Sequence, residues 1–233
     1  DRMSRMERFI SLGTLASGLH HELKNPLTAL SLHIQLLDER LRGLAAAEPL
    51  DDLLSVLKTE ICRLNGVLEE FRSFASLQRL NLQPVDALAV LDEAVRLIGP
   101  QAANQGVKII VSTPQTALPL VSLDSQKFQQ AVLNLLINAL EAMPDGGTLT
   151  LRAFLETGHL IVEVADTGVG IPAELGKNLF KPYFSTKTQG TGMGLALTEK
   201  LIGQHGGQVD FESGPHGTTF RIALPLEPPR DEP

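Results

Sequence analysis

The stretch His21-Glu22-Leu23-Lys24-Asn25-Pro26 lies in the middle of a long helical pattern near the start of the chain. A proline inside a helix removes a backbone hydrogen bond and costs about 3 kcal/mol. A helix that keeps a proline next to a histidine, a glutamate and an asparagine is therefore expected to keep it for chemistry.

Apolar residues on both sides of this stretch repeat in steps of three and four, as on the buried seam of a helix bundle. Downstream, the seam consists of Leu27, Leu30, Ile34, Leu37 and Leu41. The same register places His20 on the seam and His21 on the flank, with Asn25 one turn further along the flank. We therefore expect His20 to be a core residue and His21 to be accessible to a reagent.

A second long helical pattern follows a break at residues 43–49. Its seam consists of Leu54, Leu57, Ile61, Leu64, Leu68 and Phe71. Two amphipathic helices joined by a short connection predict a helical hairpin over residues 1–80. Because a single hairpin covers only one stripe of each helix, we expect it to pair with a second copy as a dimeric four-helix bundle.

From residue 85 onwards, strand patterns alternate with helical ones, after a predicted linker at 81–84 and before a frayed tail at 227–233. Helices are predicted at 85–104, 124–143 and 191–205. Strands are predicted at 107–111, 118–123, 148–155, 160–164, 208–211 and 218–224. Hairpins interspersed with helices predict an α/β sandwich with a mixed sheet covered on one face, so the whole chain is of the α+β class.

The composition excludes several classes of function. Of the 233 residues, 43% are hydrophobic and 20% are charged, which is typical of a folded chain. A net charge of −7 without a basic run argues against nucleic acid as a partner. A single cysteine, Cys62, fits a reducing, cytoplasmic compartment. Without a signal peptide or a membrane-spanning run, we expect no membrane contact by this chain, which reads as a fragment of a longer protein.

A polar stripe interrupts an apolar helical pattern at Asn134-Leu-Leu-Ile-Asn138-Ala-Leu-Glu141. The spacing places the three polar residues on one helix face. The other face is filled by Val132, Leu135, Leu136 and Ala139. Asparagine is unfavourable within a helix because its amide competes for backbone hydrogen bonds. Two asparagines on one stripe favour a ligand such as Mg²⁺ with nucleotide phosphates, and an exposed polar face is the alternative.

Two glycine-rich stretches follow, Asp166-Thr167-Gly168-Val169-Gly170 after a strand and Gly190-Thr191-Gly192-Met193-Gly194 at the start of a helix. In the first, the carboxylate could accept from an exocyclic amine such as that of adenine, while the glycines let the backbone approach a planar ligand. In the second, free N–H groups at a helix N-terminus could bind phosphate oxygens. A simple turn and a flexible hinge are the respective alternatives.

Aromatic residues between these two stretches predict a mobile lid. Phe180, Tyr183 and Phe184 flank Ser185-Thr186-Lys187, and Lys187 is expected to reach phosphate. Met193 is expected to be a hydrophobic contact.

These pieces, in this order, resemble the ATP-binding domain shared by histidine kinases, gyrase, Hsp90-type chaperones and MutL. The strand start Gly217-Thr218-Thr219-Phe220 is similar to the last conserved element of that domain. The resemblance covers residues 85–226. On the preceding hairpin, the His21–Pro26 stretch resembles the H-box of sensor histidine kinases, and Asn-Ala-Leu-Glu-Ala at 138–142 is similar to their nitrogen-regulation type.

The resemblance implies roles for the hairpin residues. His21 matches the phosphoacceptor, and Glu22 could hold the proton on its other ring nitrogen. Asn25 matches a position that orients water for dephosphorylation of the partner regulator. Pro26 would let the helix bend between states.

The resemblance also implies roles in the nucleotide site. Asn138 matches the Mg²⁺ ligand and Asn134 a position near the phosphates. Asp166 matches the acid that reads adenine. The accompanying nucleotide-binding residues are Gly168, Gly170, Gly190, Gly192, Gly194 and Thr219. Lys187 is added to them from the predicted lid and not from the resemblance.

The implied function is ATP-dependent autophosphorylation on His21, followed by transfer to a response-regulator aspartate, by a homodimer that could also act as a phosphatase. A conformational ATPase would use a glutamate to activate water where Asn134 stands, and would leave the H-box unexplained. A non-catalytic dimeric scaffold would not need the intact glycine and asparagine sets. The histidines His33, His159, His205 and His216 are expected to be surface or capping residues.

Overall fold

The computed structural model describes residues 27–28, 30–32, 34–37, 54–59, 61, 64–66, 68, 79–114, 118–182, 184–185 and 192–226. The chain divides into two compact units, Asp1–Gln78 and Arg79–Pro233. Each unit is described by itself.

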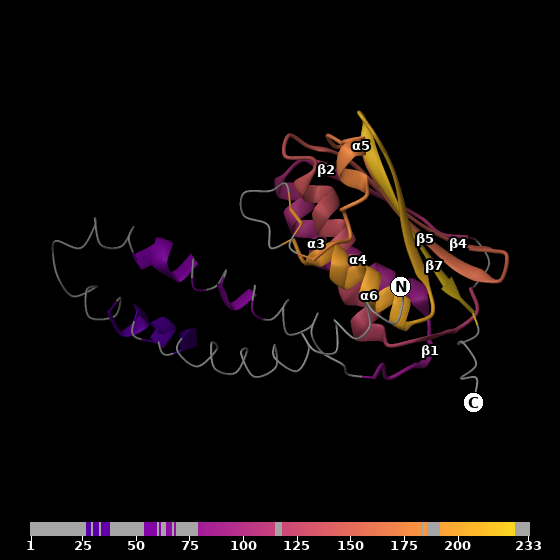
Figure 1. Ribbon diagram of the computed structural model, residues 1–233, viewed down its shortest axis with the longest axis horizontal. Coiled ribbons are helices and arrows are strands. Elements are labelled where there is room, and N and C mark those ends of the chain that lie inside the picture. The colour runs from indigo at the N-terminus through magenta and orange to yellow at the C-terminus, as the bar shows by residue number, and fades with distance from the viewer. Residues whose placement is uncertain are drawn as a thin grey trace. The chain divides into compact units, whose positions relative to one another are not determined.

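The described residues of the first unit, between 27 and 68, are all helical, as the seam pattern predicts (Figure 1). Ile34, Leu54 and Ile61, one from the first helical pattern and two from the second, form a buried cluster. Other predicted seam leucines are exposed in the single chain: Leu30 by 50%, Leu37 by 47%, Leu57 by 41% and Leu64 by 46%. Among its described residues, the first unit thus has a three-residue buried cluster and four exposed seam leucines outside it.

The second unit is a sandwich of one helical layer on one five-stranded sheet (Figure 1). The sheet has the order β2 (Val107–Ser112), β4 (Gly147–Glu156), β5 (His159–Asp166), β7 (Gly217–Pro225), β6 (Gln208–Gly214). The helical layer consists of α3 (Ala87–Asn104), α4 (Ser125–Glu141) and α6 (Gly194–Gln204). Because β2 pairs with β4 in parallel and every other pair is antiparallel, the sheet is mixed, as predicted.

Two short segments differ from the sequence prediction. The predicted linker at 81–84 contains most of a strand, β1 (Gln83–Val85), which pairs with β3 (Val121–Leu123). Three-residue strands are too short to show an alternating pattern, and Pro119 shortens β3 relative to the predicted strand at 118–123 because proline donates no ladder hydrogen bond. The following helix begins only at Ala87, where the Asp86 side chain accepts from the Leu88 N–H as the expected cap.

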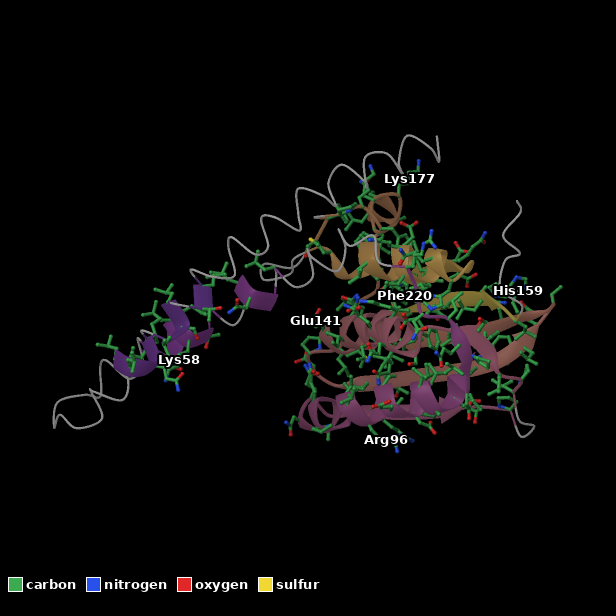
Figure 2. All side chains as sticks on the ribbon, turned by 90° about the horizontal axis from the view of Figure 1, so that it is seen from below. Lys58, Arg96, Glu141, His159, Lys177 and Phe220 are labelled. Carbon is green, nitrogen blue, oxygen red and sulfur yellow. The ribbon has the colours of Figure 1, made fainter. Side chains whose placement is uncertain are left out.

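The core of this unit lies between the helical layer and the sheet. Along β5 and β7, alternate residues are buried against the helices: Leu160, Val162, Val164, Phe220, Ile222 and Leu224. From α4 the predicted apolar face contributes Val132, Leu135, Leu136 and Ala139, all of them buried. Figure 2 shows Glu141 at one end of this unit and His159 at the opposite end, by the turn between β4 and β5.

Candidate nucleotide site

The helix α4 carries the predicted asparagine stripe. It begins after Asp124, whose side chain accepts from the Lys127 N–H, and its apolar face is fixed against the sheet. Asn134 and Asn138 are therefore held on the side of the helix away from the core, where both are half-buried. The structure agrees with the predicted division of α4 into an apolar and a polar face.

Asn134 connects α4 to the beginning of α6. Its amide nitrogen Nδ2 lies 3.1 Å from the carbonyl oxygen of Gly194 and 3.5 Å from Oγ1 of Thr198. Gly194 is the first residue of α6, at the end of the glycine-rich stretch. The asparagine stripe and the glycine-rich helix start, which are 60 residues apart in sequence, are thus in direct contact.

Asp166 ends β5 and is 8% exposed. Its Oδ1 accepts two backbone hydrogen bonds, from the Gly168 N–H at 2.8 Å and from the Thr218 N–H at 3.2 Å. Burial raises the pKa of the Asp166 carboxyl, and these two hydrogen bonds oppose the rise. Within the described part of the chain both hydrogen bonds are made to Oδ1, so Oδ2 is the oxygen that could accept from a ligand.

The loop after Asp166 passes so close to its neighbours that only glycine fits at two positions. A Cβ at Gly168 would lie 2.8 Å from both the carbonyl carbon and the Cβ of Ala142, at the end of α4. Gly170 has a positive φ of 69°, and a Cβ there would collide with the carbonyl oxygen of Gly214. The Val169 N–H donates to the Ala142 carbonyl at 3.2 Å, which ties the loop to the end of α4.

On β7, Thr218 donates its backbone N–H to the Asp166 carboxylate, whereas the sequence predicts its neighbour Thr219 as a nucleotide-binding residue. Thr218 is 4% exposed and shares the inner face of the sheet with Phe220. Thr219 is paired with Ala165 and projects from the other face, because side chains alternate along a strand. The alternating pattern of the predicted strand at 218–224 is the sequence signal that assigns Thr218 to the buried face and Thr219 to the other face.

Ser213 is a further residue that sequence reasoning did not identify. Its Oγ accepts from the Ile171 N–H at 2.7 Å and lies 2.8 Å from Oγ1 of Thr218. These contacts fasten the far end of the Asp166 loop to the hairpin of β6 and β7. A serine within a strand gives no such signal in the sequence, because the contact depends on the packing of the loop.

The described part of the glycine-rich stretch leads directly into α6. Gly192 has a positive φ of 68°, and Met193 is 1% exposed, in agreement with its predicted hydrophobic role. From the predicted lid, the Phe180 ring packs edge-on against Phe211 of β6, with 6.1 Å between ring centroids.

Of the two alternatives expected for His205, a surface residue or a capping residue, the structure supports the cap. It is 3% exposed at the C-terminal cap of α6. Its Nδ1 lies 2.8 Å from the Leu201 carbonyl, and its Nε2 accepts from the Asp124 N–H at 3.1 Å. Both contacts suit a neutral ring with its proton on Nδ1, and burial lowers the pKa of His205. It therefore joins the end of α6 to the start of α4, while His159 and His216 are exposed as expected.

The second half of α4 is the element that brings the site together. Asn134 contacts the start of α6, and Ala142, just past the helix end, contacts the Asp166 loop. At 1.5 Å per residue the two contacts are about 12 Å apart along the helix axis. Asn138 lies halfway between them on the polar stripe. The arrangement can hold an elongated ligand with a hydrogen-bonding ring at one end and an anionic group at the other.

Five of the predicted site residues lie outside the described residues: His21, Glu22, Asn25, Lys187 and Gly190. Their roles stay predictions. Among the described helices, none is long and apolar enough to cross a lipid bilayer.

Comparison with known proteins defines the family of the chain. Residues 123–228 match the family of histidine kinase-, DNA gyrase B- and HSP90-like ATPases, and residues 11–80 match the His Kinase A (phospho-acceptor) domain. The chain is 35% identical, over 98% of its length, to the sensory histidine kinase/phosphatase NtrB of Rhodobacter capsulatus, of which it covers 67%. It is 36% identical, over 96% of its length, to the sensor histidine kinase ZraS of Klebsiella oxytoca, of which it covers 48%.

A solved structure agrees with these matches. The structure of full-length ShkA in complex with AMPPNP aligns with 92% of this chain and 46% of its own, with a TM-score of 0.78 and 25% identity. The chain belongs to the sensor histidine kinase family, which confirms the resemblance found in the sequence. It spans about half the length of several curated relatives that it matches.

Proposed function

We propose that this chain is the catalytic core of a two-component sensor kinase, which transfers the γ-phosphate of ATP to His21 and then to an aspartate of a response regulator. The main support for the proposal is that α4 contacts both ends of the candidate site. Asn134 contacts the start of α6, and Ala142 contacts the Asp166 loop. The spacing of about 12 Å along the helix suits a nucleotide with its base at one end and its phosphates at the other.

Adenine would bind at the Asp166 end. The carboxylate Oδ1 is occupied by the backbone of the loop and of β7, so Oδ2 would accept from the exocyclic amine of the base. Gly168 and Gly170 let the loop backbone pack closely against Ala142 and Gly214, which would fix the loop that carries the base. This assignment of Gly168 and Gly170 follows the sequence prediction, with Thr218 in place of Thr219.

The phosphates would bind at the α6 end. The first N–H groups of this 11-residue helix are not used within the helix and face an anion favourably. Gly190, Gly192 and Gly194 would let the chain pass close to the phosphates, and Lys187 would add a positive charge. Asn138, with Asn134 one turn earlier, supplies the amide oxygens that Mg²⁺ prefers, so the donor set fits this ion. Bound Mg²⁺ would neutralise charge on the phosphates.

His21 would act as the nucleophile. A neutral ring nitrogen attacks the γ-phosphorus, the bond to the β–γ bridging oxygen breaks, and ADP leaves. Glu22 would hold the proton on the other ring nitrogen and so fix the tautomer. Asn25 would orient a water molecule in a second activity, dephosphorylation of the regulator. In the Rhodobacter capsulatus relative the two activities are named together.

The proposed partners are a second copy of the chain and the receiver domain of a response regulator. The leucines left exposed on the described helices, Leu30, Leu37, Leu57 and Leu64, support pairing of two hairpins into a four-helix bundle. We place the phosphotransfer hairpin at residues 1–78 and the ATP-binding domain at 79–226, because the second unit begins at Arg79 and includes β1. We expect neither nucleic acid nor membrane contact by this chain, and a cytoplasmic location.

Three readouts test the proposal: binding of a fluorescent ATP analogue, ADP release, and transfer of label from γ-labelled ATP to the protein. We expect binding, slow ADP release and one acid-labile label per site. Rapid ADP release without label would favour a conformational ATPase. No nucleotide binding would favour a non-catalytic dimeric scaffold. Asp166→Ala provides the negative control for binding, since it removes the acceptor for the base.

A further inference from the structure

Thr198 places a hydroxyl in the middle of an apolar helix interface. Its side chain is 0% exposed, and its neighbours Leu197, Leu201 and Ile202 on α6 are buried hydrophobic residues. A buried hydroxyl costs free energy unless it is hydrogen-bonded, and valine would fill the same volume without that cost. We therefore expect the hydroxyl of Thr198 to make hydrogen bonds, which a valine side chain could not make.

The hydroxyl has partners on both helices. Oγ1 lies 3.0 Å from the carbonyl oxygen of Gly194, one turn earlier on α6, and 3.4 Å from that of Ala131 on α4. With its proton directed to these carbonyl oxygens, Oγ1 can accept from Nδ2 of Asn134 at 3.5 Å. Thr198 is thus both a donor to the first turn of α6 and an acceptor from the asparagine of α4.

These hydrogen bonds determine the orientation of the Asn134 side-chain amide. Its Nδ2 has two acceptors on α6, the Gly194 carbonyl oxygen at 3.1 Å and the more distant Thr198 hydroxyl at 3.5 Å. If the amide were turned over, Oδ1 would face the Gly194 carbonyl oxygen, and two acceptors would repel each other. Oδ1 is therefore directed away from α6, toward the polar side of α4 that carries Asn138.

We propose that Thr198 is a positioning residue for Mg²⁺-ATP, which fixes the Asn134 amide with its oxygen toward the ligand and holds the first turn of α6 in place. The inference rests on the proposed function and adds to it a residue that does not touch the nucleotide. Because the effect passes through Asn134, removing the hydroxyl should weaken the response to Mg²⁺ and not only the stability of the fold.

The test compares Thr198→Val, which keeps the shape and loses the hydroxyl, with Thr198→Ser, which keeps the hydroxyl. The readouts are the Kd for an ATP analogue at saturating Mg²⁺, the Mg²⁺ concentration for half-maximal binding, and the Tm. Since one neutral hydrogen bond is at stake, we expect Thr198→Val to raise the half-saturating Mg²⁺ concentration about fivefold and Thr198→Ser to raise it less than twofold.

A double-mutant comparison separates positioning from packing. In an Asn134→Ala background, Thr198→Val should have no further effect on Mg²⁺-dependent binding, although it still changes the Tm. An equal effect of Thr198→Val with and without Asn134 would overturn the inference, and so would wild-type Mg²⁺ dependence in the single variant. If the wild-type chain bound no ATP analogue, the proposed function itself would fail, which is a distinct result.

Discussion

Replacing Gly168 by alanine is a severe test of the loop geometry at the adenine end. The added Cβ would collide with the carbonyl oxygen of Ala142 and lie 2.8 Å from its carbonyl carbon, whereas an ordinary van der Waals contact begins at 3.4 Å. To clear that oxygen, the loop and the end of α4 would have to separate by about 1 Å, and the Val169 hydrogen bond to the same carbonyl would lengthen. Overpacking of this kind costs about 1–3 kcal/mol.

We expect Gly168→Ala to lower the Tm of the second unit by about 2–12 °C, since 1 kcal/mol corresponds to about 2–4 °C in a domain of this size. Binding of an ATP analogue should weaken about tenfold, because the displaced loop carries the Asp166 carboxylate. The two readouts are differential scanning calorimetry and equilibrium titration.

Gly203→Ala is the matched control for this prediction. Gly203 lies in the last turn of α6 with no atom within 4 Å of an added Cβ, so the same chemical change should raise the Tm slightly through helix propensity. Equal Tm values and equal ATP affinity for Gly168→Ala and the wild-type chain would refute the close packing of this loop against α4.

Three further predictions concern the polar residues of the second unit. Asp166→Asn should abolish ATP binding without lowering the Tm at pH 7. The Tm should hold because burial raises the pKa of the carboxyl, so the neutral amide removes the cost of burying a charge. A Tm loss of several degrees would contradict this expectation. The free energy of unfolding should fall as the pH drops below about 6.5, because burial lowers the pKa of His205 and the unfolded chain then binds the proton more readily. His205→Gln should reduce the difference in unfolding free energy between urea titrations at pH 7.5 and pH 5.5. Asp124→Ala should destabilise the fold by about 2 kcal/mol and Asp86→Ala by about 1 kcal/mol. Both side chains cap a helix, but among the described residues Asp124 also accepts from the Asn81 N–H. Equal losses of unfolding free energy would show that the Asn81 contact contributes nothing.

Periodicity predicted most of the second unit. The apolar face of α4, the antiparallel strands and the cap at Asp86 follow from side-chain spacing and local hydrogen bonding, which a sequence displays directly. The short strand β1 was missed because three residues carry no period, and its pairing with β3 depends on a contact across 38 residues.

The site was predicted in its chemistry but not in its connections. Asn134 could be found because asparagine is unfavourable within a helix, and Asp166 and the glycines because the order of these stretches resembles that of a known ATP-binding domain. The Thr198 hydroxyl, Ser213 and the buried His205 could not, because each acquires its partner only when α4, α6 and the β6–β7 hairpin pack together. Thr218 was not predicted, because the two adjacent threonines differ only in the face of the strand to which they belong.

The central claim is that His21 receives the γ-phosphate of ATP. The most direct measurement is incubation of the chain with γ-labelled ATP and Mg²⁺, followed by acid and base treatment of the protein, in the wild-type chain and in the variants His21→Ala and His20→Ala. We expect an acid-labile, base-stable label in the wild-type chain and in His20→Ala, and none in His21→Ala. Undiminished label in His21→Ala would contradict the claim.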